Sequence, residues 1–142
     1  MRPSFLRALL LVAPLAIAAS GCNSNNTAVT TPTVLPVLTT DTFEGALVTG
    51  GANYHLVTAK VGNVVTTMTG IGLDPTVRLG MAIGVNDLIS CTAVMDEPNA
   101  TIGSTLTGVT TAVTNLCVKV YDPGTVAADA TVSYEVKVTY YK

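Results

Sequence analysis

The chain has 142 residues, a formal charge of −2 and 11% charged side chains. Its length suits one domain, and its hydrophobic content of 49% excludes an intrinsically disordered chain. There is no basic surplus to bind phosphates, so a nucleic-acid partner is not expected. Tryptophan is absent, and the abundance of valine, threonine and glycine favours β-sheet over a helical bundle.

The first 21 residues have the three parts of a secretory signal peptide. Arg2 and Arg7 supply positive charge, segment 6–19 is almost wholly apolar, and small residues precede a cleavage point after Gly21. The apolar run is shorter than the roughly 20 residues that a membrane-spanning helix needs, and Pro14 interrupts it. We therefore expect residues 1–21 to be cleaved rather than to span a membrane.

Three small residues, Ala19, Ser20 and Gly21, stand directly before Cys22, and this stretch resembles the lipobox of bacterial lipoproteins. The resemblance implies diacylation of the Cys22 thiol, cleavage after Gly21 and acylation of the new amine. Several acyl chains make a lasting membrane anchor. Asn23, not Asp, follows the cysteine, which by the same resemblance favours the outer membrane in a Gram-negative cell. The alternative is an ordinary signal peptide with an incidental cysteine.

The cysteine count fits this anchor. If Cys22 carries lipid, Cys91 and Cys117 remain as a pair, and an oxidising exported compartment favours a disulfide between them. Two buried free thiols are the alternative. A metal site is not expected, because two cysteines and one distant histidine lack clustered ligand spacing. After loss of Arg2 and Arg7, nine acidic side chains face five basic ones, which makes the formal charge −4.

Residues 22–40 form an uncharged segment rich in Asn, Thr and Pro. Pro32 and Pro36 favour extended backbone, so we expect a semi-flexible tether that holds the domain off the bilayer. The alternative is that the apolar residues of 34–38 pack as a first edge strand. The domain is expected to span residues 41–142.

From residue 41 onward, runs of strand-forming residues alternate with Gly, Pro and Asn. The clearest run is 131–141, where valines and tyrosines alternate with polar residues. Eight strands are expected, over residues 43–48, 54–59, 63–69, 77–85, 88–94, 105–110, 115–121 and 131–141. No long segment has helical periodicity. This pattern predicts an all-β domain, a single antiparallel β-sandwich or jelly roll of about eight strands.

Two local features refine this picture. The dipeptide 74–75 and the tripeptides 97–99 and 122–124 combine an acidic residue with proline, and they predict turns. In the run 77–85 one face is apolar and the other consists mainly of small residues. A face with such small side chains either lies under another element or forms the floor of a shallow groove.

Several stretches of the domain resemble bacterial pre-peptidase C-terminal (PPC) domains, with an opening strand that contains a glycine and a later strand in which glycine precedes valine and threonine. The stretches that carry the resemblance are 42–47, 55–57, 61–66, 116–122 and 133–138. The chain departs from the family at 114–116, where an aromatic-Gly-Thr-Tyr run is usual. The resemblance implies a non-catalytic β-sandwich module of an exported protein, with no catalytic residues.

Residues that could carry chemistry are sparse. His55 is the only histidine, and no Ser, Cys or Asp pattern stands next to it. A small envelope hydrolase would require His55 to lie beside two acids in a pocket. Phosphate-loop and dinucleotide motifs are absent, so no cofactor is expected. The acids near the turns lack the ligand density of a calcium loop and are interpreted as solvated, although a weak calcium site stays open.

The sequence therefore predicts a lipid-anchored, non-catalytic binding or structural module of the bacterial cell envelope. One sheet face or loop end would contact an envelope or extracellular protein. The alternative is a glycan-binding module, in which Tyr121, Tyr140 or Tyr141 is exposed and stacks against a sugar ring of an envelope polysaccharide.

Overall fold

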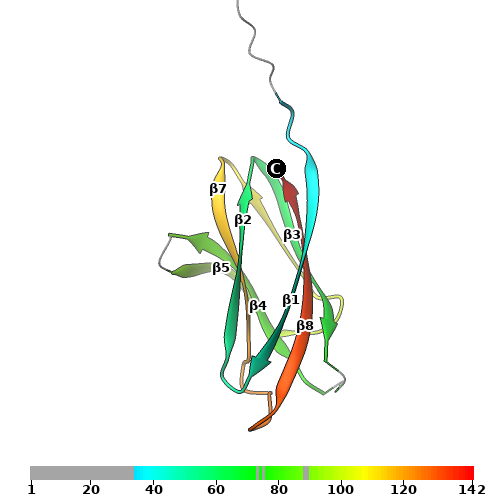
Figure 1. Ribbon diagram of the computed structural model, residues 1–142. Helices are drawn as coiled ribbons and strands as arrows, with labels where there is room; N and C mark the ends of the chain where they lie inside the picture. The colour runs from blue at the N-terminus through cyan, green and yellow to red at the C-terminus, as the bar shows by residue number, and fades with distance from the viewer. Residues whose placement is uncertain (1–33, 73, 75, 88–89) are drawn as a thin grey trace, which may run out of the picture. The chain divides into compact units, whose positions relative to one another are not determined.

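Eight β-strands make up the computed structural model, which describes residues 34–72, 74, 76–87 and 90–142 (Figure 1). The strands are β1 (Leu38–Val48), β2 (Ala52–Ala59), β3 (Gly62–Ile71), β4 (Leu79–Asn86), β5 (Cys91–Ala100), β6 (Thr105–Thr110), β7 (Thr114–Tyr121) and β8 (Thr131–Tyr141). Every expected strand is present, with shifts at some ends. Within the described ranges there is no helix of the length and apolarity that crossing a membrane requires.

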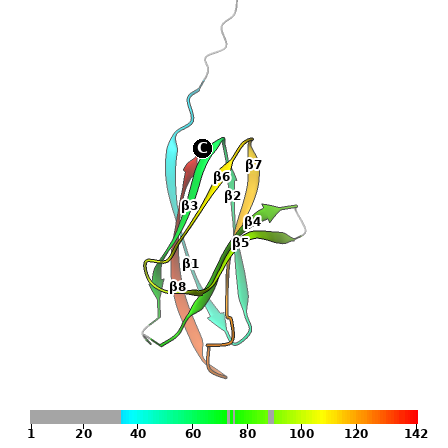
Figure 2. The ribbon, with the colours of Figure 1, turned by 180° about the vertical axis from the view of Figure 1, so that it is seen from behind.

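The strands form two antiparallel sheets, each of four strands, that pack face to face (Figures 1 and 2). Sheet A has the order β1-β8-β3-β6, and sheet B has the order β2-β7-β4-β5. The first strand therefore pairs with the last, β2 with β7, β3 with β6 and β4 with β5. This nested pairing is the arrangement of a jelly roll, so the predicted all-β fold is confirmed.

The core lies between the two sheets and follows the period-two pattern of the strands. β8 shows it most clearly, because its residues from Val132 to Tyr140 are buried at every second position and more exposed between. Met68 of β3 and Leu79 of β4 are fully buried partners in the same core. The alternation in the sequence thus decided which side of each strand faces inward.

The first strand begins earlier than the predicted start at residue 43. β1 starts at Leu38, ahead of the expected boundary at residue 41, because its partner β8 extends to Tyr141 and pairs with it. Val37 adds two backbone hydrogen bonds: its N–H donates to the Lys142 carbonyl at 3.1 Å and its carbonyl accepts from the Lys142 N–H at 2.8 Å. The edge-strand alternative is therefore right for the end of the segment. Residues 22–33 of the predicted tether lie outside the described residues.

The turn predicted at residues 97–99 is wrong, because these residues lie inside β5. β5 is an edge strand of sheet B, where a proline can turn its missing N–H away from the sheet without loss of a ladder bond. The chain reverses instead after Ala100, where Gly103 adopts φ 94° and the Ser104 N–H donates to the Thr101 carbonyl at 2.9 Å. Of the predicted strand 88–94, residues 88 and 89 are outside the described ranges, and β5 begins at Cys91.

Candidate functional site

An apolar cleft of about 290 Å³ opens between the sheets on the side where β5 and β6 are the edge strands. Five of the eight strands and the β6–β7 turn contribute to its walls. The residues that line it are Val64, Ile83, Gly84, Val85, Val94, Met95, Gly108, Val109, Thr110, Thr111, Thr114 and Leu116. None of these described lining residues carries a charge. The cleft is therefore suited to an apolar group rather than to an ion.

The two open sides of the sandwich differ in how far side chains fill the gap between the sheets. On the β1–β2 side, the rings of Phe43 and His55 stack with centroids 4.7 Å apart and fill the gap between the sheets. On the β5–β6 side, Gly108 faces Met95, and a Cβ atom at Gly108 would lie 3.6 Å from the Met95 sulfur. The missing side chain at Gly108 leaves space there, so the cleft remains open.

Exposed valines form the rim of the cleft. Val94 and Val109 are each 71% exposed, and Val85 is 44% exposed. β6 is an edge strand of Thr, Leu, Gly and Val, without the charge or proline that commonly protects a free edge from pairing. The rim and this edge together present apolar side chains beside free backbone hydrogen-bonding groups, which is the combination that a bound strand requires.

Tyr121 lies on the outer face of sheet B, but its ring already packs against other residues of the domain. A Cβ atom at Gly80 would lie only 2.1 Å from the ring carbon Cζ, so the ring packs face-on against this glycine. The Lys119 Nζ atom lies over the ring, 4.7 Å from its centroid, and the hydroxyl donates to Asp96 at 2.8 Å. Burial and this carboxylate raise the pKa of Tyr121 to about 12. The ring is therefore engaged by Gly80, Lys119 and Asp96 rather than projecting freely into solvent.

The face of β4 that carries small residues is thus covered by other residues and does not form the floor of a groove. Gly80 lies beneath Tyr121, and the other end of the strand lies beside the predicted disulfide between Cys91 and Cys117, which is confirmed with Cα atoms 5.9 Å apart. β4 separates β5 from β7 in sheet B, and Gly84 pairs with Cys117. The disulfide therefore joins the edge strand β5 to the inner strand β7 across β4.

The other two tyrosines that were predicted to bind a ligand differ in exposure. The expectation of an exposed Tyr140 is wrong, because this side chain is 2% exposed and its hydroxyl donates to Asp41 at 2.7 Å. Burial and the Asp41 carboxylate raise its pKa to about 12. Tyr141 is half-buried and packs over Gly62, where a Cβ atom would lie 2.3 Å from its ring. Tyr140 shares its face with the core valines of β8, a signal that already favoured burial.

His55 lies between aromatic rings rather than beside acids. Its Nε2 atom is 2.8 Å from the Tyr134 hydroxyl, and its ring stacks on Phe43. Burial lowers the pKa of His55 below its ordinary value. The described residues contain no group of three or more His, Cys, Asp or Glu side chains arranged to hold a metal ion. The pair of acids that the hydrolase alternative required next to His55 is not part of its described contacts.

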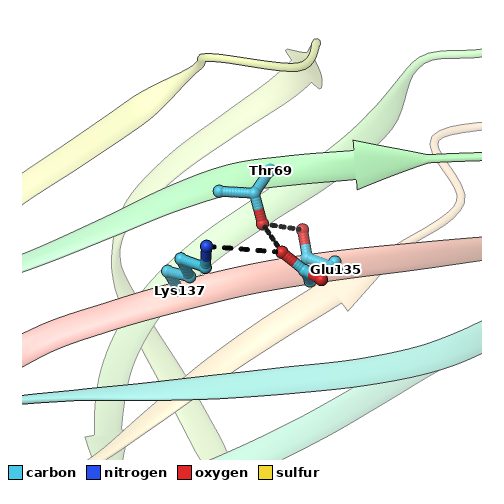
Figure 3. A network of polar contacts seen from close by, with 3 residues as sticks. All are labelled: Thr69, Glu135 and Lys137. Atoms are coloured by element: carbon cyan, nitrogen blue, oxygen red, sulfur yellow. Dashed lines mark hydrogen bonds and ion pairs between the residues drawn. The ribbon is translucent and has the colours of Figure 1, made fainter.

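A second hollow, of about 440 Å³, lies on sheet A beside the turn after β5. Glu44 and Glu135 stand directly opposite each other in the β1–β8 register and both line it. Glu135 is engaged by its neighbours: the Thr69 hydroxyl donates to its carboxylate at 2.5 Å, and the Lys137 Nζ atom lies 3.9 Å from the same oxygen (Figure 3). This network engages the Glu135 carboxylate at one wall of the hollow, which Ile71 and Ile102 also line.

Cys22 and Gly21, the predicted lipidation and cleavage residues, lie outside the described residues, so their roles stay predictions. The cleft was not predicted from the sequence. The signal that could have indicated it is the pair of uncharged stretches around Val94 and Val109, each of which places a valine on the exposed side of a strand. That signal is weak until the topology brings β5 and β6 to the same side.

No protein-family model and no curated protein sequence matches the chain. Among solved structures it is similar to PliG of Aeromonas hydrophila, a periplasmic inhibitor of g-type lysozyme, with 15% identity over 72% of this chain and 86% of that chain and a TM-score of 0.52. It is also similar to a structure of the disulfide-linked pili of Bacillus endospore appendages, with 12% identity over 76% and 91% of the two chains and a TM-score of 0.35. The first likeness shows a shared fold.

Proposed function

We propose that this chain is a lipid-anchored protein of the bacterial cell envelope that binds another envelope protein through the β5–β6 cleft and performs no catalysis. The observation that carries the proposal is the cleft itself, with its uncharged lining and its exposed rim of Val85, Val94 and Val109. Contiguous exposed apolar surface on a small domain commonly marks an interaction site.

The chemistry of the cleft indicates the kind of partner segment. Apolar side chains would enter the cleft beside Gly108, and the backbone of the partner would pair with the free edge of β6. A charged segment would lose its hydration against lining residues that offer no compensating charge. We therefore expect an extended, uncharged segment of a partner protein.

Comparison with PliG supports the class of function. That protein uses the same kind of sandwich as a periplasmic inhibitor of g-type lysozyme, which is a protein-binding task in the envelope. The PPC-like stretches of the sequence support a non-catalytic module in the same way. The glycan alternative is weaker, because Tyr140 is buried and the ring of Tyr121 is engaged by Gly80 and Lys119.

The anchor is tested by changing Cys22→Ser in the full chain and following its fractionation. We expect the wild-type chain to remain with membranes and the variant to be released, because the acyl chains supply the lasting attachment. If the chain is anchored to the outer membrane of a Gram-negative cell, the wild type will co-fractionate with that membrane. Continued membrane retention of the Cys22→Ser chain would contradict the anchor.

The binding site is tested with a photocrosslinking residue at Val109, in cells that express the full chain. We expect one recurrent protein adduct, identified by mass spectrometry, that disappears when Val94→Asp is introduced on the opposite rim. Val48→Asp is the matched control, because Val48 is an exposed valine on β1, away from the cleft. An adduct that survives Val94→Asp, or one that Val48→Asp removes equally, would contradict binding through the cleft.

A further inference from the structure

At one end of the sandwich, hydrogen bonds connect both ends of the described chain with two turns. The hydroxyl of Thr110 donates to the Lys60 carbonyl at 2.6 Å and to the Gly62 carbonyl at 3.1 Å, which ties the β2–β3 turn to the end of β6. The Lys60 N–H donates to the Tyr141 carbonyl at 2.8 Å, and Lys142 pairs with Val37. The C-terminus lies at this end in both views (Figures 1 and 2).

This end carries exposed apolar residues at its tips. Val61 in the β2–β3 turn is 57% exposed, and Val113 in the β6–β7 turn is 67% exposed. Val37 and Leu38 are also exposed, and so are Val34 and Leu35 before them. We call the residues Val37, Lys60, Val61, Val113 and Lys142 the terminal surface. Turns normally carry polar residues, so valines at the tips of two adjacent turns require an explanation.

The charges of the two ends differ. The only charged side chains in the described segments 34–38, 59–63, 110–114 and 141–142 are those of Lys60 and Lys142, and both are basic. At the opposite end, the described parts of the loops after β3 and β7 carry three acidic residues, Asp74, Asp122 and Asp129, against one basic residue, Arg78. Exposed apolar residues next to two lysines match the interfacial region of a bilayer with anionic headgroups, and the nearest acidic side chain, Asp41, accepts a hydrogen bond from Tyr140.

The position of the lipid attachment agrees with this match. The chain leaves the terminal surface at Val34, and Cys22 lies twelve residues before it in the sequence. Acyl chains on Cys22 would therefore attach the domain to the bilayer through this end and not through the acidic end. Resting on the proposed lipid anchor, we infer that the terminal surface itself lies on the membrane, with Val61 and Val113 in the interfacial region. The domain then stands on the bilayer instead of being held away from it.

The chain contains no tryptophan, which makes a direct test possible. Single variants Val61→Trp and Val113→Trp are prepared in the full lipidated chain, extracted from membranes and placed in phosphatidylcholine–phosphatidylglycerol vesicles. Val48→Trp is the matched control, an exposed valine at the other end of β1. We expect a blue-shifted emission for both tip variants and roughly twofold quenching by lipids with brominated acyl chains, because the tips would insert to a shallow depth. We expect no change for Val48→Trp.

The possible outcomes distinguish a failure of the proposed membrane contact from a failure of the lipid anchor. If the chains co-sediment with vesicles but neither tip tryptophan is quenched, the anchor stands and the inference is wrong. If Val48→Trp is quenched as strongly as the tip variants, the domain has no preferred orientation and the inference is also wrong. If the chains fail to co-sediment, the anchor fails and the inference falls with it. Circular dichroism of each variant confirms that the sheet is intact.

Discussion

The Nε2 atom of His55 and the hydroxyl oxygen of Tyr134 lie 2.8 Å apart and link the two sheets of the sandwich. His55 belongs to β2 of sheet B, and Tyr134 belongs to β8 of sheet A. The Tyr134 ring in turn covers Gly45 of β1, where a Cβ atom would lie 2.5 Å from the hydroxyl. The single histidine of the chain therefore takes part in closing one side of the sandwich.

This relationship predicts a pH dependence of stability. Burial lowers the pKa of His55 below 6.5, so the unfolded chain binds a proton more readily than the native chain. The free energy of unfolding should fall as the pH drops through 6.5 toward the native pKa, and be unaffected by His55 at higher pH. Urea unfolding between about pH 8 and 5, above the carboxylate range, should show this decrease in the wild type and not in His55→Gln. Parallel curves for the two chains would contradict the assignment.

The contact between Gly80 and Tyr121 predicts a steric effect. Gly80→Ala would place a methyl group 2.1 Å from Tyr121 Cζ, so the ring must move and lose its bond to Asp96. We expect a loss of about 1–3 kcal/mol in the free energy of unfolding. Gly108→Ala is the control, because its Cβ atom meets only the Met95 sulfur at 3.6 Å. In a Tyr121→Ala background the cost of Gly80→Ala should shrink, and equal costs in both backgrounds would exclude this contact as the cause.

The disulfide between Cys91 and Cys117 predicts a redox-dependent stability. It closes a loop with a sequence separation of 26 residues and joins the edge strand β5 to β7. Its removal by Cys91→Ser and Cys117→Ser together should cost about 2–4 kcal/mol in guanidinium unfolding. Wild-type protein unfolded with a reductant should lose a similar amount, while the double variant should not respond to the reductant. Equal stability of the oxidised wild type and the variant would show that the bridge constrains little.

Thr66 predicts a stabilising substitution. Its side chain is fully buried in β3, and its hydroxyl has no hydrogen-bond partner among the described residues. Thr66→Val keeps the shape and removes the unsatisfied group, so the free energy of unfolding should rise by about 1 kcal/mol. Thr107→Val, on the exposed side of β6, should change stability far less. A destabilised Thr66→Val chain would indicate that the hydroxyl has a partner, such as a buried water.

The strands could be predicted because their signal is local. In β8, Val132, Val136 and Val138 alternate with polar residues, and this pattern alone identifies the strand and its buried face. The turn predicted at residues 97–99 is wrong for the opposite reason. The local sequence around a proline is the same in a turn and in an edge strand, so it does not distinguish the two. Which strands are edges depends on pairing between residues far apart in the chain.

The candidate sites divide in the same way. The pairing of Cys91 with Cys117 followed from counting cysteines, because an exported compartment leaves few alternatives. The contacts of the Tyr121 ring could not be predicted from the sequence, because only the tertiary structure brings Gly80 and the Lys119 ammonium against it. An aromatic residue in a sequence shows no sign of whether its faces are free.

By itself, the sequence determined the strand content and the inward side of most strands, and it predicts the leader with Cys22. These depend on residues close together in the chain, which share one face or one short motif. Only the tertiary structure decided the nested strand order, the cleft between β5 and β6 and the joining of both described termini with two turns at one end. These features depend on contacts between distant segments, and the period-two pattern is the same for every choice of partner strand.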